Sequence, residues 1–213
     1  MKSNNTVFAL FIFGEKRLKK MKRRTFDGLA SLIGLMLAVI LLIAAGLLNW
    51  GAGFASDAVS SQLVAQKITI PTSTQNSNES ADVTAYFKDH GGKLLTTGKD
   101  AQMYADHYLG FHLSKMPTYA DASTASRSAS SALAADPTNA DLQKKADSAN
   151  ALVDTVFKGT TLRGTLLTAY AFGTLGSIAG IAAWSMGLMG LLFLLLALLG
   201  YLHLRRTDEH AAI

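Results

Sequence analysis

The chain has no cysteine and only three prolines among its 213 residues. The lack of cysteine excludes disulfide bonds, thiolate metal sites and cysteine nucleophiles. If the middle of the chain is exported, helix packing alone must therefore stabilise it. The prolines, Pro71, Pro117 and Pro137, each mark a place where a preceding strand or helix is expected to stop.

Charged residues make up only 16% of the chain, and two long stretches contain none. Gly28 to Leu48 and Leu175 to His203 are free of Asp, Glu, Lys and Arg. About 20 apolar residues suffice to cross the core of a bilayer. A core helix of a soluble protein rarely stays uncharged all round for so long. The sequence therefore predicts two transmembrane helices, over residues 28–48 and 175–203.

A basic segment followed by an apolar run is also typical of a signal peptide. The apolar core of a signal peptide spans roughly 7–15 residues and ends at a small-x-small cleavage site. The run from Gly28 is longer, and the following WGAGFASDA offers only a weak site. These features favour an uncleaved anchor, with Trp50 at the outer interface of the membrane.

The net charge of +5 and the pI near 9.4 arise from the beginning of the chain. Residues 1–27 carry eight Lys or Arg against Glu15 and Asp27, whereas residues 50–174 carry ten basic against eleven acidic side chains. A nucleic-acid-binding protein would need a basic face on its folded part. The pattern therefore favours a bilayer as partner of the basic tail, and no nucleic acid.

Basic residues flank both predicted spans on the terminal side, which sets the expected orientation. The positive-inside rule places residues 1–27 and 204–213 in the cytoplasm and residues 49–174 outside the plasma membrane. The expected membrane-interface residues are Lys19, Lys20, Lys22, Arg23, Arg24, Trp50, Arg163, Arg205 and Arg206.

The predicted fold is mainly α, with the two spans flanking an extracytoplasmic helical domain. Short helices are expected over 81–90 and 100–113, the second with Thr97 and Asp100 as a capping pair. In Lys67 to Ile70, polar and apolar residues alternate and three of the four residues are β-branched. This pattern predicts one short strand without an identifiable partner. We expect Gly51 and Gly53 to loosen the first long helix.

Two related segments predict an αα-hairpin. Pro117-Thr-Tyr-Ala-Asp121 recurs as Pro137-Thr-Asn-Ala-Asp141, and in each the threonine is expected to cap a helix. Small residues at a spacing of three and four then predict close antiparallel packing of helices over 118–135 and 138–158. Gly159 is expected to break or kink the second helix. A further helix is predicted to cover nearly all of residues 162–204.

Small residues in the second span form a predicted helix-packing face. Gly176 and Gly180 make a GxxxG pair, which Ala179 and Ala183 extend. Such pairs let helices approach closely. Packing against the first span is favoured over a dimer, and contact with another membrane protein is a further possibility.

No motif for catalysis or cofactor binding is present: there is no G-x-S-x-G, no P-loop and no GxGxxG after a strand. The weak metal candidates are His90, His107 and His112, with Asp89 and Asp106 nearby in sequence. His107 and His112 would lie about 140° apart on an α-helix. The first span lacks ionisable groups and the second has none before His203, which argues against a transporter or channel. The sequence thus predicts neither enzyme nor cofactor.

Four strings carry a resemblance to a known group of proteins: SSQLVAQKITIP, GKDAQMYADHYL, PTYADAS and KGTTLRGTLLTAYAFG. Over about residues 28–206 the chain resembles a family of small two-span membrane proteins of actinobacteria, often labelled "aromatic ring-opening dioxygenase". The resemblance implies the two-span architecture and an actinobacterial source, and no activity. A non-haem iron centre needs a facial set of His and carboxylate ligands, and no such spacing is present.

Two hypotheses of function follow. The first is a non-enzymatic accessory or scaffold subunit of a membrane or envelope complex. The alternative is an extracytoplasmic ligand- or metal-sensing domain. It would use Asp89 with the three histidines, or a pocket lined by Tyr104, Tyr108 and Phe111. That aromatic stripe is more typical of a core than of a ligand platform.

Overall fold

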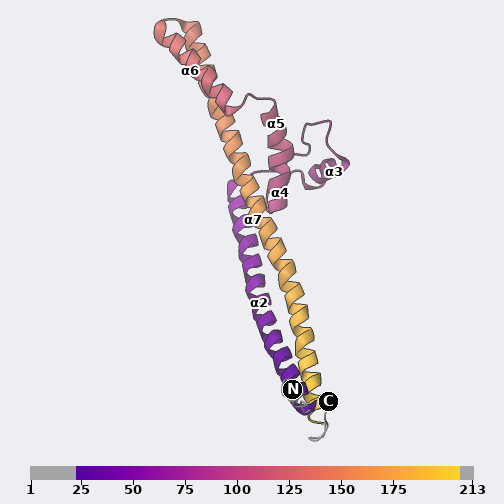
Figure 1. Ribbon diagram of the computed structural model, residues 1–213. Helices are drawn as coiled ribbons and strands as arrows, with labels where there is room; N and C mark the ends of the chain where they lie inside the picture. The colour runs from indigo at the N-terminus through magenta and orange to yellow at the C-terminus, as the bar shows by residue number, and fades with distance from the viewer. Residues whose placement is uncertain (1–22, 207–213) are drawn as a thin grey trace, which may run out of the picture. The chain divides into compact units, whose positions relative to one another are not determined.

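The computed structural model describes residues 23–206, and side chains from Thr25 onward. The described chain is mainly helical and contains no β-strand (Figure 1). Its elements in order are α2 (Arg23–Gln66), α3 (Ala81–His90), α4 (Gly98–Met103), the π-helix η1 (Tyr104–Leu109), α5 (Gly110–Ser114), α6 (Tyr119–Ala135) and α7 (Ala140–Leu204). The predicted interface residues Lys19, Lys20 and Lys22 lie outside the described range, as do the side chains of Arg23 and Arg24.

The chain divides into two compact units. Unit 1 comprises Met1–Gly46 and Trp184–Ile213, and unit 2 comprises Leu47–Ala183. In unit 1 the described parts of α2 and α7 pack through small residues. A Cβ on Gly34 would lie 3.6 Å from Ala197 Cβ, and one on Gly190 would lie 2.9 Å from Leu42 Cγ. Glycine at these positions therefore permits the close approach of the two helices.

Two described helices are long and apolar enough to cross a membrane, and they contain both predicted spans. In the most apolar windows of α2 and α7 only 6% and 17% of the residues are buried. The core helix of a soluble protein would bury most of such a window. The apolar surface of these helices is thus left for a lipid environment or for other membrane-embedded segments.

Both long helices continue through the glycines that were expected to interrupt them. The predictions for Gly51, Gly53 and Gly159 were wrong, since α2 runs unbroken to Gln66 and α7 from Ala140 to Leu204. A single glycine costs a helix only about 1 kcal/mol relative to alanine, which flanking apolar residues offset. At Gly159 an added Cβ would lie 2.8 Å from Leu113 Cδ2, so the missing side chain makes room for α5.

The core of unit 2 gathers side chains from α2, α3, α4, η1, α7 and the loops between them. Phe87 of α3 and Leu95 are fully buried. They lie in one cluster with Leu63 of α2, Leu166 of α7 and Ile70 of the loop after α2. Ala101, Met103 and Ala105 complete this core beside them. Burial of the larger side chains contributes roughly 1.5–3 kcal/mol each, so this cluster holds the short helices against the two long ones.

The predicted strand at Lys67–Ile70 was wrong, because this segment forms a single antiparallel bridge, Thr69 with Leu94. The Ile70 amide donates to the Lys93 carbonyl at 2.8 Å, and the Leu95 amide donates to the Ile68 carbonyl at 2.9 Å. The partner that sequence reasoning failed to identify is the segment between α3 and α4. The turn into it needs Gly92, whose φ of +82° favours glycine.

The predicted helix over 100–113 consists of three consecutive helical pieces. α4 leads directly into the π-helix η1, in which the Gly110 amide donates to the Ala105 carbonyl, and α5 follows. From α7, the Arg163 guanidinium also donates to the Ala105 carbonyl at 3.1 Å and to Asp106 Oδ1 at 2.8 Å. This arginine supplies a partner at the point where the regular α-helical pattern is lost.

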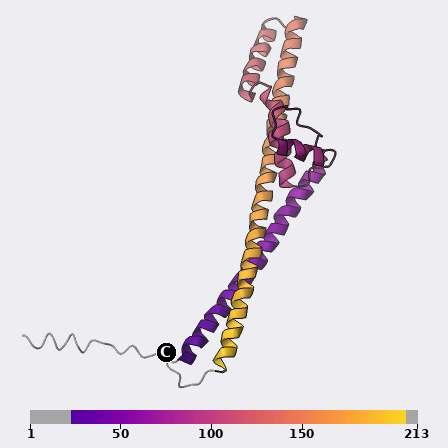
Figure 2. The ribbon, with the colours of Figure 1, turned by 90° about the vertical axis from the view of Figure 1, so that its right-hand side faces the viewer.

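α6 lies antiparallel beside the beginning of α7 (Figures 1 and 2). Thr118 Oγ1 accepts the Asp121 amide at 3.2 Å and caps α6. The cap of α7 is Asn139, whose side-chain oxygen accepts the amides of Asp141 and Leu142. The expected cap, Thr138, was wrong: its hydroxyl donates to Asp136 instead. Asparagine is among the best N-cap residues, and it directly precedes the first helical residue.

The first turn of α4 meets α7 backbone to backbone. A Cβ on Gly98 would lie 3.1 Å from the Ala169 carbonyl oxygen and 3.2 Å from the Cα atoms of Tyr170 and Gly173. These neighbours are main-chain atoms, so no flexible side chain can move away to make room.

We expect Gly98→Ala to lower the free energy of unfolding by about 1–3 kcal/mol, since the added methyl must separate α4 from α7. Gly164→Ala on the same long helix is the matched control. No atom lies within 4 Å of its Cβ position, and the better helix propensity should leave stability unchanged or raise it by up to about 1 kcal/mol. Thermal unfolding of the full chain in detergent measures both. Equal effects of the two variants would contradict the contact.

Candidate functional site

A buried carboxylate organises the polar centre of unit 2. Asp100 is only 5% exposed, yet each of its oxygens accepts hydrogen bonds. The Tyr86 hydroxyl donates to Oδ1 at 2.5 Å, and the amides of Thr96 and Thr97 donate to Oδ2 at 3.0 and 2.8 Å. The Asp100 amide in turn donates to Thr97 Oγ1, which completes the predicted capping pair as a capping box. The carboxylate thus ties α3 and the preceding loop to the start of α4.

These contacts shift the acid–base behaviour of both partners. Burial alone would raise the pKa of Asp100, but the hydrogen bonds from Tyr86, Thr96 and Thr97 outweigh it and hold the pKa below its ordinary value. Burial, followed by the hydrogen bond and negative charge of Asp100, raises the pKa of Tyr86 well above its ordinary value. At neutral pH the pair is therefore a charged acceptor with a neutral donor, and every oxygen is occupied. This arrangement stabilises the fold and leaves no group poised for proton transfer.

His107 of η1 and His112 of α5 contact the loop between α2 and α3. His107 Nδ1 donates to Glu79 Oε2 at 3.0 Å, and His112 Nε2 lies 3.3 Å from Gln75 Oε1. The Asn76 side-chain amide also donates to Glu79. On a regular α-helix these histidines would point about 140° apart. The wider π-helical turn within 104–109 brings both to the same loop, which sequence spacing could not predict.

The weak metal candidates do not form a ligand set in the described structure. His90 stacks on Tyr86 with ring centroids 4.0 Å apart, and its Nδ1 donates to the Tyr86 carbonyl. Asp106 pairs with Arg163, away from the histidines of the proposed site. Within residues 23–206, no group of three His, Asp or Glu side chains is placed to hold a metal ion.

The aromatic stripe predicted on one helix face is divided between two environments. Tyr104 and Tyr108 lie 5.0 Å apart, centroid to centroid, and pack against the core of unit 2. Burial, and secondarily the neighbouring Tyr108, raises the pKa of Tyr104. Phe111 lies beneath the Lys115 ammonium at 3.9 Å. The two tyrosines serve the core, as their spacing suggested, and the three rings line no common pocket among those described.

The predicted helix-packing residues contact α2 within the same chain. A Cβ on Gly176 would lie 3.1 Å from Ala55 Cβ, and one on Gly180 would lie 3.7 Å from Ala52 Cβ. Ala183 is buried and Ala179 is half-buried. These small residues are therefore occupied inside unit 2, and a partner protein would need a different surface.

The described interface residues have specific neighbours. Trp50 is 71% exposed and stacks on Phe54 at 6.0 Å, and Arg205 donates to the Tyr201 hydroxyl at 2.8 Å. Arg163 is held by Asp106 and the Ala105 carbonyl. Its predicted place among lipid headgroups, like those of Trp50, Arg205 and Arg206, stays a prediction.

An open apolar groove of about 550 Å³ lies between α2 and α7 in unit 2. We call it the Phe54–Phe172 groove; both phenylalanines are more than half exposed. Its floor is made by buried Val59, Leu63 and Leu166. Its full lining is Phe54, Ala55, Ala58, Val59, Gln62, Leu63, Gln66, Thr165, Leu166, Thr168, Ala169 and Phe172.

The groove extends beyond the predicted ends of both spans. At 1.5 Å per helical residue, Gln66 lies about 27 Å along α2 from Leu48, and Thr165 lies about 15 Å along α7 from Leu175. Leu175 and Ile178, which follow Phe172 along α7, are also exposed. Part of the apolar groove thus lies outside the segments predicted to span a membrane. Among the described surfaces outside the spans, it is the best candidate for contact with a partner.

The chain was compared with protein-family models, curated proteins and solved structures, and none of them matches it.

Acid should destabilise unit 2 through Asp100. A carboxyl whose pKa is lowered on folding contributes stability that is present above its unfolded pKa of about 3.9 and is lost as the pH falls through the folded value. We expect Asp100→Asn to destabilise the protein by about 1–3 kcal/mol at pH 7 and to flatten the loss of stability below pH 4. Thermal unfolding between pH 7 and pH 2.5 measures this.

Asp121→Asn is the control, because Asp121 occupies the same capping position in α6 but is exposed. It should change stability by less than about 1 kcal/mol. An unchanged pH profile in Asp100→Asn would contradict the role assigned to the buried carboxylate.

The loop over η1 should loosen when Glu79 is removed. Glu79→Ala deletes the acceptor of both His107 and Asn76, so we expect amide hydrogen exchange in residues 71–80 to accelerate roughly tenfold, for a loss of about 1–2 kcal/mol. Asn78→Ala is the control, since its side chain is exposed and only its backbone amide is bonded. Hydrogen-exchange mass spectrometry distinguishes the two variants. Unchanged exchange in Glu79→Ala would show that the histidine contact does not hold the loop.

Proposed function

We propose that this protein is a non-enzymatic accessory or scaffold subunit of a membrane or envelope complex. In this proposal α2 and α7 cross the plasma membrane with both termini in the cytoplasm, and residues 49–174 form an extracytoplasmic helical domain. The positive-inside pattern of the sequence supports this orientation. The observation that carries the function is the Phe54–Phe172 groove, an apolar surface that neither the domain nor lipid tails would cover.

The proposed occupant of the groove is a transmembrane helix of another protein that continues outward beyond the bilayer. The groove is bounded by two long helices, and its lining on α7 ends at Phe172. Leu175 and Ile178, which are exposed within the predicted span, follow Phe172 in the sequence. A helix lying along it would therefore contact apolar residues both inside the membrane and above it. At its outer end Gln62, Gln66 and Thr165 offer hydrogen-bonding groups to the polar part of such a helix.

The small-residue face of α7 does not serve this purpose in the proposal. Gly176 and Gly180 already contact Ala55 and Ala52, so the partner is expected on the aromatic side of the helix pair. Aromatic side chains supply large contact area, and they are enriched at the centres of protein interfaces.

The sensing alternative would rest on the loop that His107 and His112 hold against η1 and α5. These contacts link a polar loop to the centre of the domain, and a ligand that displaced Glu79 would free it. The histidines are satisfied by protein groups, however, and they line none of the described cavities. We therefore favour the accessory role.

Site-specific photo-crosslinking in native membranes tests the proposal. Benzoylphenylalanine is placed at Thr168, which lines the groove, or at Ala171, which is also exposed on α7 but lies outside the lining. We expect Thr168 to give one main adduct with a second membrane protein, and the crosslinked peptide to map to a transmembrane helix or its outward extension. Ala171 should give little of this adduct.

A packing variant adds a second measurement. Thr168→Trp fills the groove and should reduce co-purification of the crosslinked partner several-fold, whereas Ala171→Trp should not. Adducts with lipid only, with a second copy of this chain, or with equal yield from both positions would overturn the proposed occupant.

A further inference from the structure

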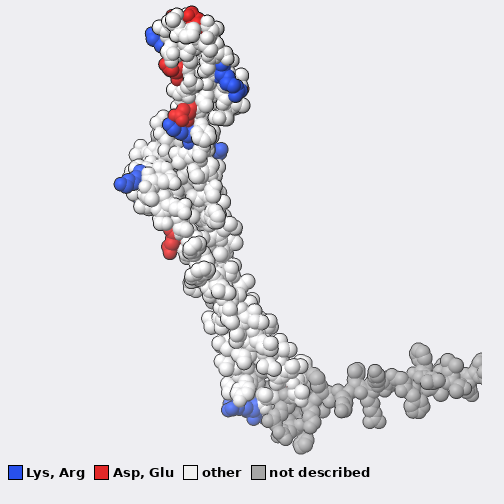
Figure 3. Space-filling model, turned by 90° about the vertical axis from the view of Figure 1, so that its left-hand side faces the viewer, with Lys and Arg blue, Asp and Glu red and all other residues white. Residues whose placement is uncertain are grey.

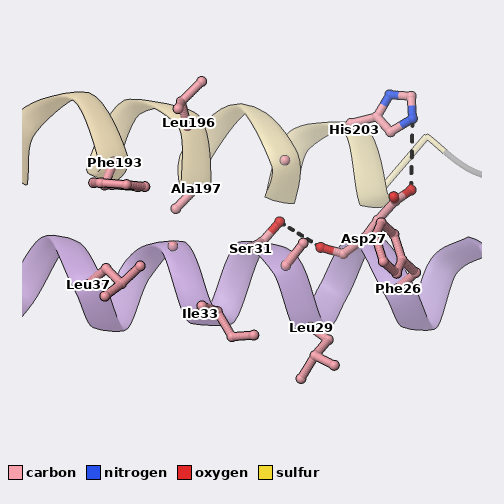
Figure 4. A pocket seen from close by; sticks show the side chains of 13 residues that line it. Phe26, Asp27, Leu29, Ser31, Ile33, Leu37, Phe193, Leu196, Ala197 and His203 are labelled. Atoms are coloured by element: carbon pink, nitrogen blue, oxygen red, sulfur yellow. Dashed lines mark hydrogen bonds and ion pairs between the residues drawn. The ribbon is translucent and has the colours of Figure 1, made fainter.

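A second groove lies in unit 1, between the first part of α2 and the last part of α7. Its volume is about 560 Å³, and it is lined by Phe26, Asp27, Leu29, Ala30, Ser31, Ile33, Gly34, Leu37, Phe193, Leu196, Ala197, Gly200 and His203. We call it the Asp27–His203 groove. Figure 4 shows that Asp27 and His203 stand together at one end, whereas the other labelled side chains are apolar except for Ser31.

The apolar walls of the groove face outward from the helix pair. Phe26, Leu29, Ile33 and Leu196 are each about half exposed. The helices meet behind them through small residues, because a Cβ on Gly34 would lie 3.6 Å from Ala197 and one on Gly200 would meet the Ser31 side chain. The Asp27–His203 groove therefore runs beside the line along which the two helices touch, and it is open to the surroundings of unit 1.

The length of the Asp27–His203 groove matches the thickness of the hydrocarbon region of one bilayer leaflet. Phe26 to Leu37 spans eleven helical steps, about 16 Å, and Phe193 to His203 spans about 15 Å. Half of a hydrocarbon core of about 30 Å is also about 15 Å. An extended acyl chain that enters at the level of Asp27 and His203 would therefore end near Leu37 and Phe193, where the groove ends.

Basic residues that suit a phospholipid headgroup follow directly after the polar end of the groove in the sequence. Arg205 and Arg206 follow His203 by two and three residues, and Figure 3 shows basic side chains at this end of unit 1 beyond an uncharged surface. These cations favour an anionic phosphate.

Asp27 requires that the bound headgroup also donate a hydrogen bond. Its Oδ2 atom is buried and receives no hydrogen bond from the described part of the chain, and His203 Nε2 lies 4.0 Å away (Figure 4). A buried carboxylate oxygen in this position needs a donor. A headgroup hydroxyl beside the phosphate would supply it.

We propose that the Asp27–His203 groove binds one anionic phospholipid with a hydroxylated headgroup. One acyl chain lies against Phe26, Ile33 and Phe193. The phosphate is attracted by Arg205 and Arg206, and a headgroup hydroxyl donates to Asp27. The proposal requires that α2 and α7 lie in a bilayer, but it is independent of any protein in the Phe54–Phe172 groove.

The test uses the full chain in nanodiscs that contain phosphatidylglycerol, phosphatidylcholine or phosphatidic acid with identical acyl chains. Transfer into detergent and native mass spectrometry then count the lipids that remain bound. We expect one phosphatidylglycerol to be retained at least fivefold more than phosphatidylcholine, and more than phosphatidic acid, which lacks the hydroxylated headgroup.

Four variants separate the parts of the site. Ala30→Trp fills the furrow and should abolish retention, whereas Leu32→Trp, at an exposed position outside the lining, should not. Arg205→Gln with Arg206→Gln should bring the retention of phosphatidylglycerol close to that of phosphatidylcholine, because the attraction of the two cations for the phosphate is lost. Asp27→Asn should remove the preference over phosphatidic acid.

Two outcomes overturn the inference. Equal retention of the three lipids by the unaltered chain would mean that only non-specific boundary lipid is carried along. Equal loss in Ala30→Trp and Leu32→Trp would mean that retention depends on the helix pair in general and not on this groove. Neither outcome bears on crosslinking at Thr168, so the two proposals succeed or fail separately.

Discussion

The constraint on which this structure depends is that two long helices expose apolar side chains along most of their length. α2 and α7 bury few of the residues in their most apolar windows, although those windows are as hydrophobic as a membrane span. Water would make such a surface costly at roughly 25 cal/mol per Å². A bilayer would cover this surface, and the remaining helices can be short because the long ones support them.

Within unit 2, a single buried carboxylate plays a comparable role on a smaller scale. Asp100 binds the Tyr86 hydroxyl and the amides before α4, so α3, the bridge segment and the helical run from Gly98 share one polar centre. Close backbone contact between Gly98 and Gly173 then seats this assembly on α7. A chain without disulfides thus obtains its specificity from one satisfied charge and from glycines at points of close approach.

The two grooves suit different occupants. The Phe54–Phe172 groove extends beyond the predicted spans, and in our proposal a protein segment covers it. The Asp27–His203 groove has the length of one leaflet and a charged end, which suits a lipid. Both lie beside lines of small residues, since close helix contact leaves furrows on either side of it. In unit 2, by contrast, the carboxylates of Asp100, Glu79 and Asp106 are each satisfied by neighbouring protein groups.

The sequence by itself determined the helical class, the two apolar helices and the capping pair of Thr97 and Asp100, because uncharged length and local hydrogen bonding are properties of contiguous residues. It misjudged Gly51, Gly53 and Gly159, since the cost of a glycine is small beside the packing that surrounds it. Only the tertiary structure decided the pairing of Thr69 with Leu94, the bond from Arg163 to η1, the common loop of His107 and His112, and both grooves. Each of these depends on groups far apart in the chain, or on a π-helical turn that no local sequence pattern predicts.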